Sequence, residues 1–309
     1  MDRRTFIKAT GGLAAAAALG ENAASAATKP LARRTLGKTG QKLSILGFGG
    51  IVVSAVEPEE ASRLVHEAYD RGVNYFDVAP SYGNAEERLG PALEGLRDKV
   101  FLACKAERRD REGAAAQLRQ SLRTLRTDHF DLYQLHGLSK MEDLEQAAGP
   151  NGALEALTAA RQEGLIRWIG FSAHSPEVAL AAMDRFDFDT VLFPINFVTW
   201  MRNGFGPQVL AKAEEKGMGR LAIKAMACTH WKKDETREYP KCWYRPLTDP
   251  AQIALALRFT LSQSVTAAIP PGDARLFRQA LDVASHFKPI TAAEQKELAS
   301  LAASTDPIF

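Results

Sequence analysis

Four side chains of this 309-residue sequence have the types and the spacing that carbonyl chemistry requires. Asp77, Lys105 and His136 each stand at the end of a short apolar run, and Tyr82 follows Asp77 in a turn-rich loop. Side chains on a strand alternate between its two faces, so residues two positions apart share a face. If the three runs are neighbouring parallel strands, an acid, a base and an imidazole gather at one edge, with a phenol beside them.

Reduction of a ketone or aldehyde to an alcohol needs hydride at the carbon and a proton at the oxygen, which an enzyme supplies from a well-placed acid. A phenol, with a pKa near 10, is a weak acid at neutral pH. A nearby ammonium lowers that pKa, and an imidazole can share or orient the proton. We therefore expect Tyr82 to be the general acid and Lys105 to tune it. Asp77 would pair with the lysine, and His136 would be a second donor.

Composition and charge are those of an ordinary globular protein. Apolar residues make up 46% and charged residues 25%, and the net charge of +2 gives no basic footprint for nucleic acid. The three cysteines have no CxxC spacing, so we expect no metal site. A Cys228–Cys242 disulfide stays open as an alternative, and Cys104, on the opposite side of its strand from Lys105, is expected to be a small buried residue.

The first 26 residues are typical of a removable targeting segment. Within Arg3–Lys8, two arginines are followed by a spacer, an aromatic residue, an aliphatic residue and a lysine, and an apolar run and Ala24-Ser-Ala26 come next. The run of about 12 residues is too short to span roughly 30 Å of hydrocarbon, so we expect no stable membrane insertion. The segment resembles a twin-arginine signal peptide, which implies export by the twin-arginine (Tat) machinery to the periplasm. The alternative is a disordered basic tail on a cytoplasmic protein.

From Leu43 onward, short apolar runs alternate with helical patterns, which is typical of βα units and a parallel sheet. We expect eight strands: Leu43–Gly47, Val73–Asp77, Val100–Lys105, Phe130–His136, Ile166–Ser172, Thr190–Phe193, Arg220–Ile223 and Thr266–Ile269. The expected helices include Glu57–Arg71, which has Pro58 in its first turn and Gly72 as its stop signal, and also Ala114–Arg126 and Ala251–Leu261.

Eight strand–helix pairs within about 250 residues predict an α/β fold, a single (β/α)8 TIM barrel with its active site at the carboxyl ends of the strands. Asp77, Lys105 and His136 fall at those ends. A doubly wound sheet is the alternative, but the chain lacks its G-x-G-x-x-G fingerprint after the first strand.

Two further segments complete this barrel. Arg34–Leu43 has the pattern of a short N-terminal hairpin that closes the barrel floor. No linker divides 27–309, so we expect one domain there after the 1–26 signal. The aromatic-rich insert Cys228–Pro250, after the seventh strand, is a candidate lid or substrate loop.

Several of these segments resemble the signatures of the aldo-keto reductase superfamily. They are Asp70–Gly83, Phe101–Lys105, Asp131–Gly137, Ile169–His174 and Ala268–Gly272. The resemblance runs from about Arg34 to the final helix. It implies a (β/α)8 barrel that binds NADP(H) across its C-terminal face, with the catalytic roles already given to Asp77, Tyr82, Lys105 and His136.

The resemblance also implies cofactor contacts. Ser172 matches the family serine that holds the nicotinamide amide. His174 substitutes for the asparagine that commonly follows this serine, and Asn196 stands near the usual glutamine. The full set of expected contacts is Gly49, Ser172, His174, Asn196, Lys224, Ile269, Pro270, Gly272, Arg275 and Arg278.

The adenosine end of this expected site departs from the family pattern. Pro271 occupies the position of the usual basic residue, so a clamp for the 2′-phosphate must come from Arg275 or Arg278. NAD(H) therefore stays open as the cofactor beside NADP(H).

The sequence thus predicts an exported NADP(H)-dependent oxidoreductase that interconverts a small-molecule carbonyl and an alcohol. Two alternatives keep the barrel. One is a non-catalytic, cofactor-binding regulatory module, as in potassium-channel beta subunits. The other is an aldolase-like site in which Lys105 forms a Schiff base.

Overall fold

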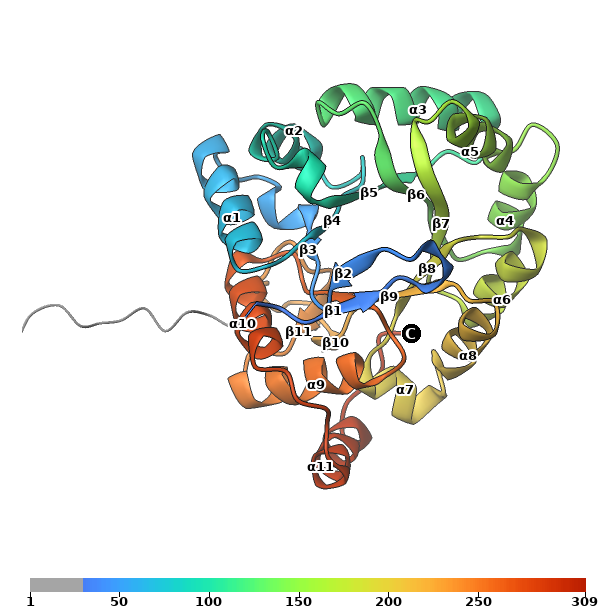
Figure 1. The fold of residues 1–309 in the computed structure, drawn as a ribbon. Coiled ribbons are helices and arrows are strands. Elements are labelled where there is room, and N and C mark those ends of the chain that lie inside the picture. The colour runs from blue at the N-terminus through green and yellow to red at the C-terminus, as the bar shows by residue number, and fades with distance from the viewer. Residues whose placement is uncertain (1–29) are drawn as a thin grey trace, which may run out of the picture.

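The computed structural model describes residues 30–309, so the expected signal peptide lies outside the described residues. Eight parallel strands form one curved sheet, and the helices lie around it (Figure 1). The strands are, in their order around the sheet, β3 (Phe48–Gly49), β4 (Tyr75–Asp77), β5 (Phe101–Ala106), β6 (Phe130–Leu138), β7 (Ile166–Ala173), β8 (Thr190–Pro194), β9 (Gly219–Ile223) and β12 (Ala267–Ile269). A parallel bridge between Leu46 and Ala268 joins the two edges, which closes the (β/α)8 barrel that the sequence predicts.

The helices begin and end at conventional signals. Asp110 accepts a hydrogen bond from the backbone N–H of Gly113 at the start of α3, and Thr291 and Glu294 form a capping box on α11. The helices are α1 (Pro58–Asp70), α2 (Ala85–Ala92), α3 (Arg111–Thr124), α4 (Met141–Ala148), α5 (Ala153–Gln162), α6 (Pro176–Arg185), α7 (Phe197–Asn203), α8 (Pro207–Glu215), α9 (Pro250–Ser262), α10 (Ala274–Ser285) and α11 (Ala292–Ala303). The three helices expected by range are present as α1, α3 and α9, with ends shifted by a few residues.

An antiparallel hairpin of β1 (Arg33–Thr35) and β2 (Lys42–Ser44) covers the amino-terminal end of the barrel. Leu36, at its turn, is fully buried among the residues that fill the barrel interior. The backbone N–H of Lys38 donates to the carbonyl of Gly217 (2.6 Å), just before β9. The hairpin therefore closes the barrel floor, as the sequence predicts.

The first expected strand, Leu43–Gly47, is wrong in its boundaries. Its first two residues end β2 of the hairpin, and the barrel strand β3 begins only at Phe48. The Asn74 side chain accepts the backbone N–H of Ser44 (2.7 Å), and the Ser44 hydroxyl donates to the carbonyl of Leu46 (2.7 Å). These hydrogen bonds separate the two strands. The apolar run in the sequence is continuous, so it does not show where one strand ends and the next begins.

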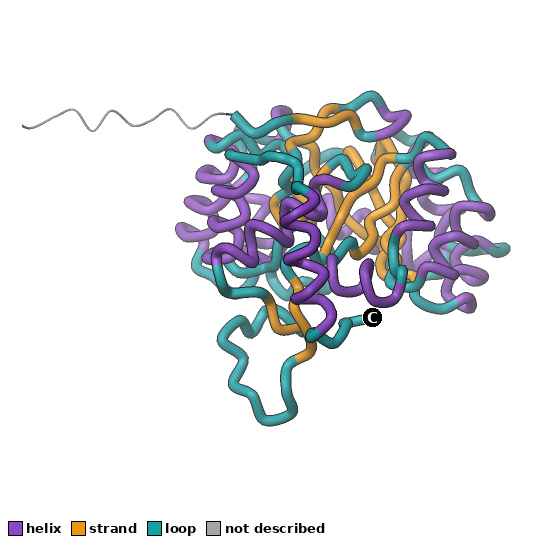
Figure 2. Tube along the Cα trace, turned by 90° about the horizontal axis from the view of Figure 1, so that it is seen from below, coloured by secondary structure: helices purple, strands orange, loops and turns teal. Residues whose placement is uncertain are grey.

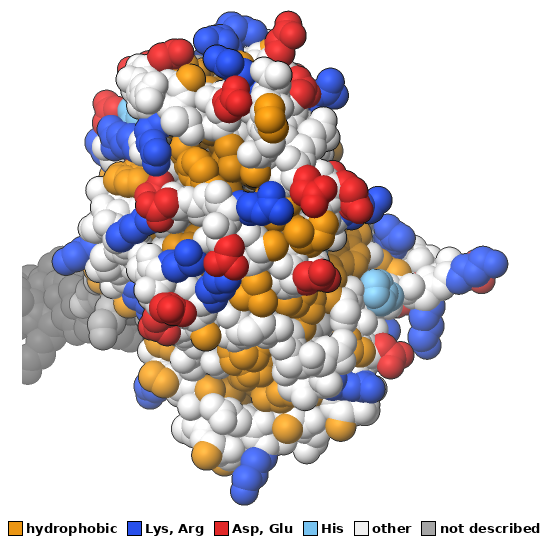
Figure 3. Space-filling view, turned by 90° about the vertical axis from the view of Figure 1, so that its right-hand side faces the viewer, with side chains coloured by type: hydrophobic (Ala, Val, Ile, Leu, Met, Phe, Trp, Pro, Cys, Tyr) orange, Lys and Arg blue, Asp and Glu red, His pale blue; other side chains and the backbone are white. Residues whose placement is uncertain are grey.

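The barrel strands bury both faces. Leu132 of β6 packs inside the barrel, whereas its neighbour Tyr133 packs in the layer between strands and helices. Outside this layer the surface carries Lys, Arg, Asp and Glu side chains in alternation, with small apolar patches between them, on the face drawn in Figure 3. Among the helices of residues 30–309, none combines the length and the apolarity needed to cross a membrane.

The expected insert is a second hairpin, built from β10 (Ala227–His230) and β11 (Tyr244–Pro246). It projects from the end of the barrel opposite the β1–β2 hairpin, and the chain ends beside it (Figure 2). Its Cys228 and Cys242 are free cysteines, so the disulfide left open by the sequence is not formed. The carboxyl ends of the barrel strands thus lie beneath a hairpin and the C-terminal segment.

Candidate active site

A buried ion pair lies at the carboxyl ends of β4 and β5. The Lys105 ammonium donates to the Asp77 carboxylate and to the carbonyl of Val78 (2.9 Å), and the side chains of the two paired residues are only 1% and 3% exposed. The second carboxylate oxygen of Asp77 accepts hydrogen bonds from Gln134 (3.0 Å) and from the Tyr75 hydroxyl (3.2 Å). Buried charges require this degree of pairing, so the cluster has one well-defined arrangement.

The groups around Lys105 keep its ammonium group charged. Burial alone disfavours the ammonium, but its interactions with the Asp77 carboxylate and then with Tyr82 outweigh burial and raise the pKa of Lys105 well above its usual value. A Schiff base requires a neutral amine as nucleophile. The geometry therefore favours a fixed positive charge at Lys105 over the aldolase-like alternative.

Tyr82 lies over this pair. The Lys105 nitrogen is 5.0 Å from the centre of the Tyr82 ring, and that ring meets His136 edge-on at 5.8 Å between centroids. Burial raises the pKa of the Tyr82 phenol, and the Lys105 ammonium acts against this increase. The expected tuning by lysine is thus present but is outweighed by burial, and the phenol holds its proton as a donor must.

His136 contacts the carboxylate of Glu107, a residue that is not among the site residues predicted from the sequence. Its Nδ1 lies 3.2 Å from an oxygen of Glu107. Burial lowers the pKa of His136, and the Glu107 carboxylate opposes that decrease. Glu107 stands two residues after Lys105, so strand alternation was the signal that could have placed both on one face.

A cavity of about 210 Å³ brings these four catalytic candidates together. Seven of the ten expected cofactor contacts also line it: Gly49, Ser172, His174, Lys224, Ile269, Pro270 and Gly272. The remaining lining residues were not singled out as contacts: Ile51, Leu192, Ile223, Lys241, Cys242, Trp243, Tyr244 and Pro271. Four of these, 241–244, belong to the insert, so the insert forms one wall of the cavity.

Ser172 and His174 lie where β7 ends. The Ser172 hydroxyl accepts the backbone N–H of Gly137 (2.8 Å), which fixes its position next to His136. The His174 ring stacks on Phe309 at 5.5 Å. Burial, followed by the positive charge of Lys224, lowers the pKa of His174 to about 4, so this imidazole is neutral at physiological pH.

Lys224 lies at the carboxyl end of β9 in an unusual backbone conformation, with φ of 68°. Its nitrogen lies 5.4 and 4.9 Å from the ring centres of Trp243 and Tyr244. Burial lowers the pKa of Lys224 to about 8. Within residues 30–309, no carboxylate is among the groups that shift its pKa, so this cation can accept an anionic ligand group in the cavity.

Asn196 does not line the cavity. Its amide group donates to the carbonyls of Lys224 (3.1 Å) and Ala227 (2.7 Å), and its oxygen accepts the backbone N–H of Val198 (2.9 Å) at the start of α7. The structure therefore places Asn196 as a cap that holds the Lys224 backbone.

The two arginines of the expected phosphate clamp also lie outside the cavity lining, on α10. Arg275 pairs with Asp273 (3.0 Å) and packs over the Tyr239 ring (4.4 Å), and Arg278 binds the Glu67 carboxylate (2.7 Å). Each guanidinium therefore already has an anionic partner, for which a 2′-phosphate would have to compete.

Two glycines and two lysines of the cavity lining bear on its fit to a dinucleotide. A Cβ atom added at Gly49 would lie 2.9 Å from Ile269, and one added at Gly272 would overlap Ile51, so both positions need glycine because a neighbouring side chain packs against the backbone. Lys224 and Lys241 supply positive charge to the same cavity. This combination suits a pyrophosphate group.

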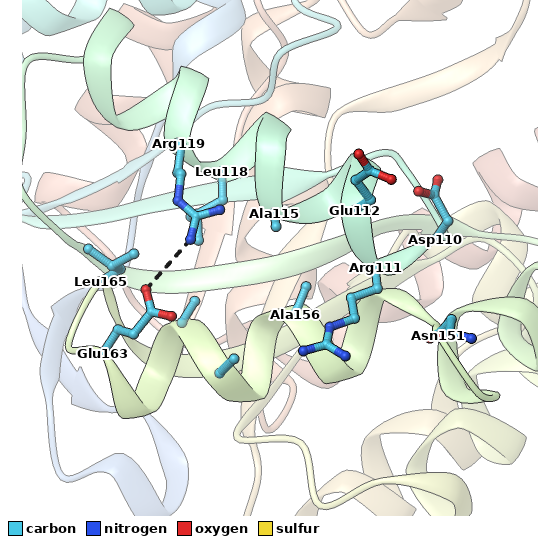
Figure 4. A pocket seen from close by; sticks show the side chains of 12 residues that line it. Asp110, Arg111, Glu112, Ala115, Leu118, Arg119, Asn151, Ala156, Glu163 and Leu165 are labelled. Atoms are coloured by element: carbon cyan, nitrogen blue, oxygen red, sulfur yellow. Dashed lines mark ion pairs between the residues drawn. The ribbon is translucent and has the colours of Figure 1, made fainter.

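A larger hollow of about 570 Å³ lies on the outside of the barrel, between α3 and α5 (Figure 4). Its floor is formed by small apolar side chains such as Ala115 and Ala156, and an Arg119–Glu163 ion pair (3.8 Å) crosses it. It contains none of the expected site residues. Residues 30–309 also hold no group of His, Cys, Asp and Glu side chains suited to a metal ion.

Asp77, Tyr82, Lys105 and His136 thus converge on one cavity of a (β/α)8 barrel. The chain belongs to the aldo/keto reductase family, whose model matches residues 45–303. A model of the TAT (twin-arginine translocation) pathway signal sequence matches residues 1–20. The resemblance to the aldo-keto reductase superfamily and the resemblance to a twin-arginine signal peptide are therefore both confirmed.

Among curated proteins, the chain is 29% identical over 210 residues to L-galactose dehydrogenase from Arabidopsis thaliana, which covers 63% of this chain and 65% of that protein. It is 32% identical over 154 residues to the uncharacterized oxidoreductase YqkF from Bacillus subtilis (strain 168), which covers 47% and 50%. The matches thus span less than two thirds of the length of each relative. Together with the family match they support an oxidoreductase.

Solved structures resemble the fold over nearly their whole length. The holo form of the aldo-keto reductase AKR11C1 from Bacillus halodurans superposes with a TM-score of 0.69 at 24% identity, covering 88% of this chain and 96% of that one. The thermostable aldo-keto reductase Tm1743 gives a TM-score of 0.64 at 22% identity, covering 88% and 100%. At these identities the comparison shows the fold alone.

Proposed function

We propose that the protein is an NADP(H)-dependent oxidoreductase that interconverts an aldehyde or ketone with an alcohol, with Tyr82 as general acid. The observation that carries this proposal is the buried Asp77–Lys105 pair beneath Tyr82, in a cavity shared with His136. A fixed positive charge beside a phenol stabilises the phenolate that forms when its proton leaves. The pair therefore acts when charge develops in the reaction.

The residues of the chain have separate tasks in this proposal. Tyr82 gives its proton to the carbonyl oxygen in reduction and takes it back in oxidation. Lys105 stabilises the phenolate, Asp77 holds the ammonium in place, and His136 supplies a second hydrogen bond to the reacting oxygen. When bound, the reduced nicotinamide supplies hydride to the carbonyl carbon.

The cofactor would lie along the cavity wall formed by β7, β9 and β12. Ser172 and His174 would hold the nicotinamide end, and Lys224, with its backbone capped by Asn196, would face the pyrophosphate. Gly49, Ile269, Pro270 and Gly272 would contact it at the ends of β3 and β12. NADP(H) is proposed over NAD(H) because Arg275 and Arg278, at the start of α10, could exchange their carboxylate partners for a 2′-phosphate.

We also propose that residues 27–309 form one domain exported to the periplasm by the Tat machinery. The match of residues 1–20 to that signal supports this location. The aromatic insert would close over the cofactor: Lys241 on the insert donates to the carbonyl of Val52 (2.9 Å), next to β3 on the other side of the cavity. A cofactor enclosed in this way would stabilise the native state through binding linkage.

Tyr82→Phe tests the proposal. The variant keeps the ring and should bind NADPH with unchanged affinity, measured by fluorescence titration. Turnover with a simple aldehyde should fall by about 10² to 10⁴, the usual worth of one general acid. Tyr69→Phe, on α1 and outside the cavity, is the matched control and should keep full activity.

Two outcomes would overturn this assignment. Equal turnover of Tyr82→Phe and the unmutated protein would remove Tyr82 from the chemistry. Tight NADPH binding without turnover in the unmutated protein would favour the regulatory module instead.

A further inference from the structure

Glu107 is a carboxylate at the edge of the cavity that the roles above leave without a task. It follows β5 directly, and its Oε1 atom lies 3.2 Å from Nδ1 of His136. Its side chain is 32% exposed and that of His136 is 20% exposed, so the contact lies between the cavity and solvent. One end of the imidazole is thus held by a carboxylate, and the other end is left for the cavity.

The backbone of His136 is also fixed. The Arg109 guanidinium donates to its carbonyl oxygen (2.5 Å), and the next residue, Gly137, donates its N–H to Ser172 (2.8 Å). The ring itself meets Tyr82 edge-on. Backbone and ring are therefore both restrained, and rotation of the imidazole away from Glu107 would break the one hydrogen bond that its ring makes within residues 30–309.

Several charged or titratable groups face this imidazole from the surrounding elements: Asp77 of β4, Tyr82 of the following loop, Lys105 of β5, Glu107 and Arg109 after β5, and His174 after β7. Lys105 disfavours a positive imidazole, and Asp77 is already paired with that lysine. His136 and then the Ser81 hydroxyl lower the pKa of Glu107 to about 2. Glu107 is therefore anionic throughout the pH range in which an imidazole titrates.

We propose that Glu107 is a positioning residue that fixes the His136 tautomer and supplies the countercharge for its protonated form. This proposal rests on the proposed function. With Nδ1–H donated to Glu107, a neutral His136 presents the lone pair of Nε2 to the cavity and accepts a proton in the alcohol-oxidising direction. Protonated His136 presents Nε2–H and donates in the carbonyl-reducing direction.

The protons balance in both directions. In reduction, Tyr82 gives its proton to the carbonyl oxygen and imidazolium His136 returns one to the phenolate, which leaves neutral His136 still bonded to Glu107. Solvent then protonates Nε2. In oxidation, each step runs in reverse, and the proton from the alcohol leaves through Tyr82 and Nε2.

Glu107→Gln separates this role from a merely structural contact. The amide keeps the size and can still bond Nδ1, but it removes the negative charge. A carboxylate at hydrogen-bonding distance changes the protonation equilibrium of an imidazole by about tenfold or more. Because Glu107 and His136 are both partly exposed to solvent, we expect a change of about tenfold. The pKa of His136 should therefore fall, and kcat/KM for reduction at neutral pH should fall by up to about tenfold. For oxidation, which needs neutral His136, kcat/KM should stay high down to a lower pH.

The experiment uses the mature protein in two measurements. NMR follows the pH titration of the His136 ring without substrate, and steady-state kinetics record kcat/KM against pH in both directions. Glu107→Asp tests rescue by the conservative variant. Glu112→Gln, an exposed glutamate on the first turn of α3, is the matched control and should change neither measurement.

The proposal expects Glu107→Gln to shift both the His136 titration and the kinetic pH limbs, and Glu107→Asp to restore them in part. An unchanged His136 titration would overturn it, with or without activity. A shifted titration with unmoved kinetic limbs would also overturn it, because the contact would then have no part in the reaction. Absence of turnover in the unmutated protein would instead refute the proposed function, and with it this role, while the NMR result would still report the contact.

Discussion

Asp77 and Lys105 should behave as one unit, and neutralising them singly and together measures this. Lys105→Met leaves the Asp77 carboxylate buried with only Gln134 and Tyr75 as donors. Asp77→Asn leaves the buried ammonium with the carbonyl of Val78. Each single variant therefore isolates a charge that the other residue compensates in the native protein.

The expected magnitude follows from this burial. Removing one partner of a buried ion pair costs about 3–5 kcal/mol in the free energy of unfolding, because the remaining charge is left uncompensated. Independent effects would sum to about 6–10 kcal/mol in the double variant. We expect the double variant instead to lose no more than a single variant, which gives a coupling of at least about 3–5 kcal/mol.

Urea unfolding followed by circular dichroism measures these three losses. The exposed Lys38–Asp187 pair (2.5 Å) is the matched control, and its variants Lys38→Met and Asp187→Asn should each cost about 0–1 kcal/mol. Activity should fall in both site variants, more for Lys105→Met, because the ammonium acts directly on the Tyr82 phenol. Additive losses of stability in the double variant would refute the pairing.

Three further predictions concern the cofactor, export and pH. Replacing Arg275 and Arg278 together by Ala should weaken NADPH binding far more than NADH binding in a fluorescence titration; equal losses would place the 2′-phosphate elsewhere. Replacing Arg3 and Arg4 by Lys should leave folded precursor in the cytoplasm on fractionation, and unchanged periplasmic protein would contradict the signal. Because the pKa of His174 is lowered to about 4, the unfolded chain binds a proton that the native state excludes, so thermal stability should fall as the pH falls from about 6.5 to 4. His174→Gln should flatten that decline, and an unchanged slope would exclude His174 as its source.

The fold could be predicted because its signal is local and repeated. Each barrel strand is a short apolar run followed by an amphipathic helix, and the connection rules leave few topologies for such a chain. The predicted bounds of the first strand were wrong because the apolar run from Leu43 onward belongs to both the hairpin and the barrel. The hydrogen bond between Ser44 and Asn74 is one of the contacts that separate the two strands. That contact joins residues far apart in the sequence, so no local pattern contains it.

Asp77, Lys105 and His136 were predictable for the same reason, since each lies at or near the end of a strand, and Tyr82 follows Asp77 in the next loop. The surroundings that determine their charge were not. Arg278 faces Glu67 from another helix, and the Lys224 ammonium lies against two rings of the insert, Trp243 and Tyr244. Residue types alone cannot give these partners. Glu107 is different: strand alternation from Lys105 could have identified it.

Isotope transfer tests the central claim most directly. The mature protein would be given NADPH carrying deuterium at the transferable position of the nicotinamide, together with a simple aldehyde, and the alcohol would be examined by mass spectrometry. The account predicts one deuterium on the former carbonyl carbon, with its formation slowed by about 10² to 10⁴ in Tyr82→Phe. An alcohol without deuterium, or no alcohol from protein that binds the cofactor, would contradict it.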